Sequence, residues 1–390
     1  GDFTAVAGTG YFVNTTSGEV DVTLPAGTAG AVVAVKDYAN TWDTNNCILV
    51  PNGSDKIGGL AASATLSTKG SAITLVFVDS TQGWLVTDDG LQSNADNNPF
   101  LVATGGTITE DGDFKVHTFT GPGAFNVTCL ANSPSNNVVA YMVVAGGGGS
   151  GACKGGGAGA GGFREGTTSP IIPYTASPLV APAGLPVSVQ PYPITVGAGG
   201  TGAATPGTAT SGADSIFSSI TSAGGGRGSD GSPSQTPALN GGSGGGGARY
   251  LNTPGNGNTP PVSPPQGNNG GSAGFPGAPG DEGAGGGGAT AVGQNSTDPA
   301  AGDGGAGATS SINGTPTARA GGGGGGSCGM PTVGAGGTGG GGAGAGGPGN
   351  NGSNGTANTG GGGGGGPNFG TAGTGGSGGS GIVIIRYKFQ

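Results

Sequence analysis

The sequence predicts an all-β protein in which ordinary β modules are followed by a bundle of glycine-rich extended helices. Glycine makes up about a third of residues 146–381 and is concentrated in dense tracts. Short apolar and aromatic segments such as 192–196 and 214–217 separate these tracts, and the chain closes with the apolar run 382–387. Because glycine loses much backbone entropy on ordering, a glycine-rich stretch usually forms a flexible linker. Apolar segments such as these are not expected in a flexible linker, so we expect this region to fold.

The first 90 residues alternate short apolar runs with turn signals such as Asn52-Gly53 and Gln82-Gly83. The apolar runs are 11–13, 20–24, 31–35, 47–50, 73–78 and 84–86. Runs spaced by roughly ten residues predict a small antiparallel β-sandwich-like or barrel-like module. The polar stretch after this module predicts a linker over residues 91–104.

Residues 105–145 form a second β-rich stretch, which we expect to be a cap on the glycine region. Its last apolar run, 138–145, leads directly into the first glycine tract. We expect this run to pair with three later segments, namely 194–196, 216–220 and the C-terminal strand 382–390. That pairing would tie both ends of the glycine region 146–381 to the cap.

Three ordered states of glycine-rich backbone are distinguished by sequence spacing. Collagen requires glycine at every third position, and 274–283 keeps that register while its surroundings do not. Cross-β structure needs side chains that interdigitate, which 321–326 and 360–366 do not supply. Consecutive glycines instead let extended three-fold helices approach closely and exchange N–H···O=C bonds with several neighbours. We therefore predict a bundle of polyproline II-type (polyglycine II) helices, with the connecting segments gathered at its two ends.

Composition excludes several classes of partner and site. Charged residues make up 8% of the 390 residues and the net charge is −9, so a basic surface for nucleic acid is missing. The cysteines, Cys47, Cys129, Cys153 and Cys328, show no Cys-x-x-Cys pairing that would indicate zinc or a disulfide framework. No apolar run approaches the ~20 residues of a membrane span, and no membrane insertion is expected. The chain begins with Gly1, so we expect either processing or one segment of a longer polypeptide.

Catalytic motifs are also missing, and we predict that the protein is not an enzyme and has no cofactor and no metal site. His117 is the single histidine, and its place between Val116 and Thr118 in a β segment favours a structural role over a Ser/His/Asp arrangement. Matches to Gly-x-Gly-x-x-Gly carry no information in this composition, and no Gly-Lys-Ser/Thr follows for a phosphate-binding loop. The acidic residues at 88–89 and 110–113 lack the spacing of a calcium loop.

Several glycine-bearing motifs resemble the glycine-rich domain of tailed-phage fibre proteins. They are 143–149 (VVAGGGG), 161–164 (GGFR), 192–200 (YPITVGAGG), 222–226 (SAGGG) and 381–387 (GIVIIRY). The segments 11–18, 35–39 and 42–46 similarly resemble modules in structural proteins of marine cyanophages. The resemblance implies a virion tail fibre or fibre-tip adhesin, extracellular, in which polyglycine helices form a rigid scaffold and distal loops contact the host.

The partners implied by this resemblance are a host cell-surface receptor, either a polysaccharide or an outer-membrane protein, and other virion tail proteins. Tail fibres are commonly trimers, whereas a bundle closed within one chain could be a monomer, so both a homotrimer and a monomer remain open. Exposed aromatic and arginine side chains on loops are the expected receptor contacts. The candidates are Phe163, Arg164, Tyr174, Arg249, Tyr250, Leu251, Met330 and Phe369. Phe163 belongs to a recurring motif, which favours packing against the bundle instead.

Two other classes of protein fit parts of the sequence. A secreted bacterial glycine-rich surface protein or filament-forming protein could polymerise through glycine bundles or exposed β edges. A fibre-borne polysaccharide depolymerase would need paired carboxylates in a cleft, and the scattered acidic residues show no such pair.

Overall fold

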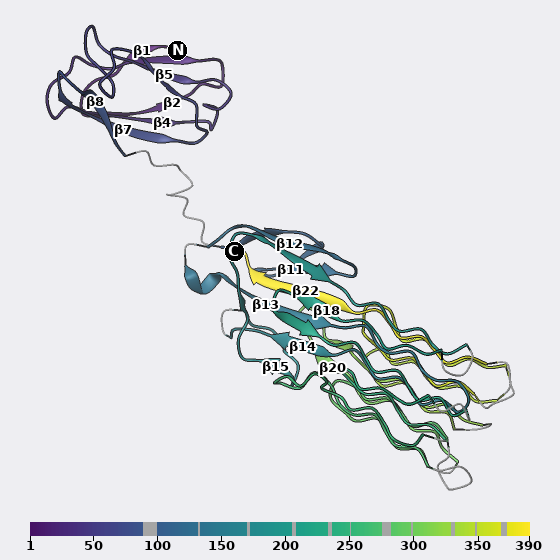
Figure 1. Ribbon diagram of the computed structural model, residues 1–390. Coiled ribbons are helices and arrows are strands. Elements are labelled where there is room, and N and C mark those ends of the chain that lie inside the picture. Colours follow the sequence, from purple (N-terminus) through teal and green to yellow (C-terminus); the bar gives the residue numbers. More distant parts are fainter. Residues whose placement is uncertain are drawn as a thin grey trace. The chain divides into compact units, whose positions relative to one another are not determined.

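A computed structural model describes most of the chain (Figure 1). The described residues are 1–88, 100–131, 133–169, 172–204, 208–232, 236–249, 251–274, 282–297, 299–328, 332–347, 349–367 and 373–390. They form two compact units, Gly1–Asn97 and Asn98–Gln390. The predicted all-β class is confirmed: the described part of the chain contains strands and extended segments, with one short 3-10 turn at Pro134–Asn136. No described helix is long and apolar enough to cross a bilayer.

The N-terminal unit consists of two four-stranded sheets that share one core. The first sheet has the order β1 (Phe3–Thr4), β3 (Val20–Thr23), β5 (Cys47–Val50), β6 (Ala64–Leu66). The second has the order β2 (Thr9–Val13), β4 (Val32–Asp37), β7 (Ala72–Asp79), β8 (Gly83–Asp88). Alternate residues of each strand face inward, and Trp42 and Trp84 are buried in the core they form.

The expected antiparallel pattern of this unit is only partly correct. The pairs β1–β3, β3–β5 and β2–β4 are parallel, whereas β5–β6, β4–β7 and β7–β8 are antiparallel. The first five strands alternate between the two sheets, so neighbours within a sheet are not consecutive in the sequence. Each such connection crosses between the sheets, which gives parallel neighbours where a hairpin would give antiparallel ones.

The second unit begins with two sheets that pack face to face. The larger has the order β10 (Thr107–Asp111), β11 (Phe114–Phe119), β22 (Ile382–Lys388), β13 (Val138–Val144), β14 (Phe163–Gly166), β15 (Val180–Ala181), and β16 (Leu185–Pro186) also pairs with β13. The smaller has the order β19 (Ile220–Ser222), β18 (Ser215–Phe217), β17 (Pro191–Thr195), β12 (Gly123–Cys129), β9 (Val102–Thr104). A separate hairpin is formed by β20 (Ala308–Ser310) and β21 (Thr317–Arg319).

The C-terminal strand β22 lies between β11 and β13, so the end of the chain joins the start of the glycine region. The segments 194–196 and 216–220 do not join this sheet as expected, because β17 and β18 extend the smaller sheet from β12. Their inward side chains, Ile194 and Phe217, are buried in the core between the two sheets. Residues 102–104, expected in a linker, form β9, because Ala103 is buried in that same core.

The larger sheet is buried on both faces. One face contacts the smaller sheet, and the other packs on alanines of the bundle and on the β20–β21 hairpin. This double burial explains why β13 and β22 are nearly continuous apolar runs, as expected for strands covered on both sides.

The glycine-rich segments run from the sheets as extended lines that lie side by side (Figure 1). Consecutive amides of one segment donate to different neighbours, and every third amide returns to the same neighbour. In the first segment, Gly146 donates to Ala213, and Gly149, three residues on, donates to Thr210 of the same neighbour. Gly147 and Ser150 donate in the same way to Gly379 and Gly376 of a second neighbour, and Gly148 donates to Gly159 of a third. The N···O distances are 2.9–3.0 Å. Each amide therefore pairs with a segment other than those its chain neighbours use, and the pattern repeats every third residue.

Backbone packing in the bundle is too close for side chains at most glycines. A Cβ atom added to Gly147 would lie 2.1 Å from the carbonyl oxygen of Gly361, and one added to Gly286 would lie 2.0 Å from that of Ala158. Buried N–H and C=O groups need partners, and here they find them on adjacent segments. Hydrogen bonding between backbones therefore replaces a hydrophobic core.

The chain passes back and forth along the bundle. Segment 145–150 leaves β13 and segment 155–162 returns to β14, so the turn at 151–154 lies at the end of the bundle away from the sheets. Antiparallel neighbours such as 156–162 and 223–229 continue this pattern. The connections therefore fall into two sets, which we call the sheet end and the far end.

Candidate functional site

The predicted contact residues are divided between the two ends of the bundle. Phe163, Arg164 and Tyr174 lie at the sheet end, whereas Arg249 and Leu251 lie at the far end. Tyr250, Met330 and Phe369 lie outside the described residues. The candidates therefore do not form one site.

Burial corrects the prediction of Phe163 as a receptor contact, whereas Tyr174 is half-buried. Phe163 is 1% exposed and packs in the core between the larger sheet and the bundle, because β14 directs it onto the alanines of the neighbouring segments. Tyr174 packs against the same core, with its ring 5.8 Å from the guanidinium of Arg386. Arg164 is half-buried, and its Nη1 donates to the carbonyl of Thr221 over 3.4 Å. None of these three is a freely presented contact.

The far-end candidates border a tight turn. Ala248 and Leu251 exchange two backbone hydrogen bonds, both 2.9 Å long. Arg249 and Leu251 are half-buried. The two bonds fix the ends of the turn, Ala248 and Leu251, against each other, and a fixed connection is the property expected of a presented loop.

A second far-end feature joins three connections through one carboxylate. Glu282 forms an ion pair with Lys154, with Nζ and Oε1 3.2 Å apart, and accepts the backbone N–H of Cys328 over 2.8 Å. Both ionic side chains are largely buried, with exposures of 6% and 12%. The pair ties the turn at 151–154 to two distant parts of the chain, and sequence spacing contained no signal for it.

A buried polar cluster also lies at the sheet end, outside the residues that the sequence predicts as contacts. Glu165, Arg319 and Arg386 are each 5% exposed or less. Glu165 accepts from the Ser310 hydroxyl over 2.5 Å and from the Ser177 amide over 2.9 Å. The available signal was Arg386 itself, a charged residue inside the apolar run of β22, because a charge in a strand buried on both faces must be paired.

Arg386 is held by three kinds of contact. Its Nη1 lies 2.7 Å from Asp111 Oδ2 and 3.3 Å from the carbonyl of Ile312, and its guanidinium lies 4.4 Å from the ring centre of Phe114. These contacts connect β22 to the edge strand β10 and to the loop of the β20–β21 hairpin.

Burial perturbs the ionisable groups around this cluster. It lowers the pKa of Arg319, an effect that the charge of Glu165 partly offsets. Burial, followed by the nearby Glu165 carboxylate, raises the pKa of Tyr174. Perturbed groups often mark functional sites, but Arg319 and Tyr174 are perturbed by burial next to Glu165 and Arg386, whose charges are already engaged with neighbouring groups. The cluster therefore acts to hold the hairpin on the sheet.

His117 has the structural environment that its sequence context favours. It is fully buried, with Nδ1 2.7 Å from the carbonyl oxygen of Gly105 and Nε2 3.3 Å from the hydroxyl of Tyr387. Only a protonated nitrogen can pair with a carbonyl, so Nδ1 carries the proton. Burial lowers the pKa of this imidazole, which keeps it neutral at pH 7. Within the described residues, no group of three or more His, Cys, Asp or Glu could hold a metal ion.

On the outer surface of the bundle, side-chain oxygens of one segment accept backbone N–H groups of a neighbouring segment. Asn351 accepts from Thr374 over 2.9 Å, Asn354 from Ser377 over 2.8 Å, and Asp303 from Ala335 over 2.7 Å. Further examples are the pairs Asn240–Asn256, Asn269–Gly257, Asn295–Ser272 and Asp214–Gly224. Unpaired backbone donors at an edge invite another chain to pair, and these side chains occupy such donors.

The fold and its sites thus define an all-β protein in which hydrogen-bonded glycine segments are anchored on a two-sheet cap. Residues 119–388 match the family model described as a glycine-rich domain, and the chain belongs to that family. A search of curated proteins finds no match.

Proposed function

We propose that this protein is a non-enzymatic structural protein of a tailed-phage virion, a tail fibre or fibre-tip adhesin that recognises a host cell-surface receptor. The proposal rests on the bundle, whose backbone N–H groups are hydrogen-bonded between its own segments. The connections at its far end include the turn that hydrogen bonds between Ala248 and Leu251 close. The resemblance of the glycine-bearing motifs to tailed-phage fibre domains points the same way.

Rigidity supports a binding role. Loops on an ordered scaffold lose less conformational entropy on binding than loops on a flexible chain. In this bundle the scaffold is made by backbone hydrogen bonds, so side chains in the far-end connections can change without loss of the bundle's own contacts. The receptor would be a polysaccharide or an outer-membrane protein, and the remainder of the chain would connect to other tail proteins.

The alternative is a secreted bacterial surface protein or filament-forming protein. One observation favours it: the edge strands β2 and β10 each pair with a single strand in the described structure. The acceptor side chains on the bundle surface argue against polymerisation through the glycine segments, because they occupy donors that a second bundle would need.

The proposal is tested on virions and on host cells together. Antibodies against the purified protein are expected to label the tails of intact virions in electron micrographs. The purified chain is expected to slow virion adsorption to host cells, and Arg249→Ala combined with Leu251→Ala is expected to weaken that competition. Arg164→Ala, at the sheet end, is the matched control. Absence of the protein from virions, together with long homopolymers in culture medium, would favour the filament alternative.

A further inference from the structure

The chain contains seven asparagines that are directly followed by glycine, and all of them lie in the described residues. They are Asn52, Asn240, Asn256, Asn269, Asn313, Asn351 and Asn354. In such a pair the backbone nitrogen of the glycine can attack the side-chain amide carbon of the asparagine, because glycine has no side chain that hinders the approach. A new N–C bond closes a five-membered succinimide ring, and ammonia leaves. Water then opens the ring at either carbonyl and gives aspartate or isoaspartate.

Three of these asparagines are held by one repeated arrangement, which we call the Asn–Gly clamp. The side-chain oxygen of the asparagine accepts the backbone N–H of one residue on the neighbouring segment. The glycine that follows donates its own N–H to the carbonyl of that same residue. The clamps are Asn351-Gly352 with Thr374 (2.9 and 2.8 Å), Asn354-Gly355 with Ser377 (both 2.8 Å) and Asn240-Gly241 with Asn256 (2.7 and 3.1 Å).

The Asn–Gly clamp opposes closure of the succinimide ring. Closure requires the asparagine side chain to turn toward the glycine nitrogen, and it requires that nitrogen to give up its hydrogen. In the clamp both groups are hydrogen-bonded to the neighbouring segment. Local opening must therefore precede the reaction, and the rate falls with the fraction of time that the clamp is open.

The other three glycine amides that follow an asparagine in the second unit are occupied as well. Gly257 donates to Asn269 Oδ1 over 2.8 Å, Gly270 donates to the Gly255 carbonyl over 3.1 Å, and Gly314 donates to the Ser311 carbonyl over 2.9 Å. In the second unit, each nitrogen that could attack is therefore already engaged as a donor.

Asn52 and Gly53 lie in a turn after β5, where the Asp55 amide donates to the Asn52 carbonyl over 2.9 Å. Gly53 is exposed, with φ of +53°. Among the described residues, neither the Gly53 amide nor the Asn52 side chain has a hydrogen-bond partner. We infer that Asn52 is a site of spontaneous deamidation in the native protein, whereas the Asn–Gly clamps keep asparagines of the bundle in the amide form. An isoaspartate in the bundle would lengthen the backbone by one carbon and interrupt its three-residue repeat.

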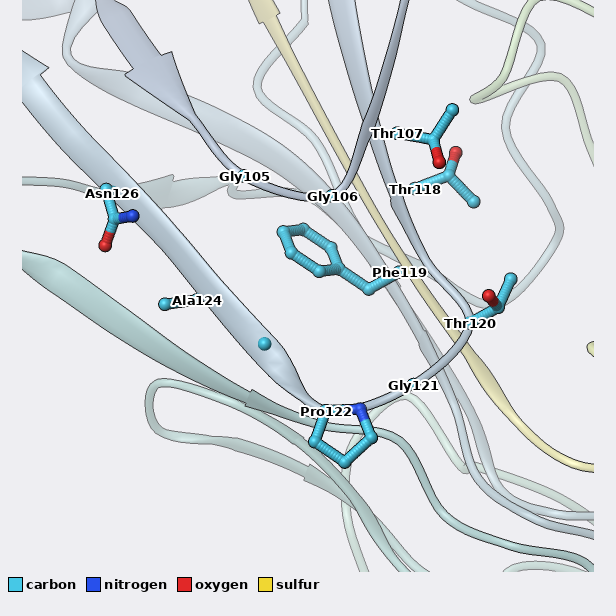
Figure 2. Close-up of a pocket in the computed structure, with 11 residues that line it drawn as sticks. Gly105, Gly106, Thr107, Thr118, Phe119, Thr120, Gly121, Pro122, Ala124 and Asn126 are labelled. Atoms are coloured by element: carbon cyan, nitrogen blue, oxygen red, sulfur yellow. The ribbon is translucent and has the colours of Figure 1, made fainter.

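Exposure alone predicts the opposite order of reaction. Asn351 and Asn354 are exposed, whereas Asn52 is half-buried. Asn126, labelled in Figure 2, is half-buried on β12 as well. It is followed by Val127, whose branched side chain hinders attack and whose amide donates to the Gln190 carbonyl over 3.1 Å. Asn126 should therefore stay unmodified, and it serves as an internal control of similar exposure.

The test compares the full chain in buffer and in denaturant, both kept at mildly alkaline pH. Peptide mass spectrometry after chromatography measures aspartate and isoaspartate at each asparagine over time. Asn52 is expected to convert at nearly the same rate in both conditions. Asn351 and Asn354 should convert at least about tenfold more slowly in buffer, because two hydrogen bonds of ordinary strength must open first. Asn52→Gln should remove the fast reaction, because glutamine would have to close a larger ring.

Thr374→Pro opens one clamp and leaves the next one in place. Proline has no N–H to donate to Asn351, and its fixed φ suits an extended three-fold helix. Conversion of Asn351 in buffer should rise toward its rate in denaturant, while that of Asn354 stays unchanged. If Thr374→Pro does not fold, Ser377→Pro takes its place, with Asn354 as the residue that responds and Asn351 as the control.

Two results would overturn the inference. One is conversion of Asn52 in buffer that is no faster than conversion of Asn351. The other is conversion of Asn351 and Asn354 that is as fast in buffer as in denaturant. Neither result depends on whether the protein belongs to a virion, so the adhesin proposal stands or fails separately.

Discussion

A methyl group on Gly157 would lie 2.0 Å from the carbonyl oxygen of Gly323, although the two residues are far apart in the sequence. Gly157 itself donates its amide to Ala284, on a different neighbouring segment. Gly157 therefore donates a hydrogen bond to one neighbouring segment and lies so close to another that no side chain fits between them. This relationship makes the bundle sensitive to single methyl groups at buried glycines.

Gly157→Ala is expected to destabilise the second unit by more than about 2 kcal/mol, since the obstructing atom is backbone and cannot rotate away. Gly121→Ala is the matched control, because its added Cβ meets nothing within 4 Å. Thermal unfolding followed by calorimetry measures both variants. Equal midpoints for the two would mean that the segments separate easily and that the bundle is not close-packed.

The all-β class and the strand character of 382–388 could be predicted from the sequence because each depends on local pattern. The parallel pairs of the N-terminal unit could not, because they follow from the order in which the chain visits two sheets. The sheet that β17 and β18 join depends on which apolar faces pack together. The alternation of apolar residues in a strand predicts the strand itself but not the strand with which it pairs. The buried cluster around Glu165 and Arg386 joins segments from distant parts of the chain, and no spacing rule links them.

Arg386→Met is expected to lower the free energy of unfolding by about 2–4 kcal/mol. The substitution removes a buried cation together with its hydrogen bonds and its stacking on Phe114. Asp111→Asn should cost less than about 1 kcal/mol, because the Asp111 side chain is 45% exposed and water can replace much of the pair. Chemical denaturation of both variants measures the difference. A larger loss for Asp111→Asn would show that the ion pair, rather than the buried contacts, holds β22.

The stability of the second unit is expected to fall as pH drops below about 6.5, the ordinary pKa of histidine, because His117 is the single histidine and burial lowers its pKa. Above that pH the imidazole is neutral in both states and contributes no slope. Below it the unfolded chain takes up a proton that the folded protein resists. His117→Gln should unfold at a lower temperature overall but with a weaker dependence between pH 7.5 and 5.5. If the unfolding temperature falls equally with pH in the parent protein and in His117→Gln, the pH dependence comes from carboxylates and not from His117.

Two of the four cysteines are expected to resist alkylation in the native protein. Burial raises the pKa of Cys47 to about 12 and that of Cys153 to about 11, so their thiolates are scarce at pH 8. Cys129 and Cys328 are exposed. Mass spectrometry after brief iodoacetamide treatment should find the label on Cys129 and Cys328, and on all four after unfolding. Rapid labelling of Cys153 in the native state would indicate that the far-end turn opens.

Asn354→Leu is expected to increase self-association of the protein, because it uncovers the Ser377 amide that Asn354 accepts over 2.8 Å. The loss of folding stability should stay near about 1 kcal/mol, since water can bond to the exposed donor. Ser353→Leu is the matched control: it adds the same apolar side chain to an exposed position of the same segment and uncovers no donor. Sedimentation equilibrium over a range of concentrations measures both. If both variants associate equally, the added apolar surface is the cause. Asn354 would then not prevent association by occupying the Ser377 amide.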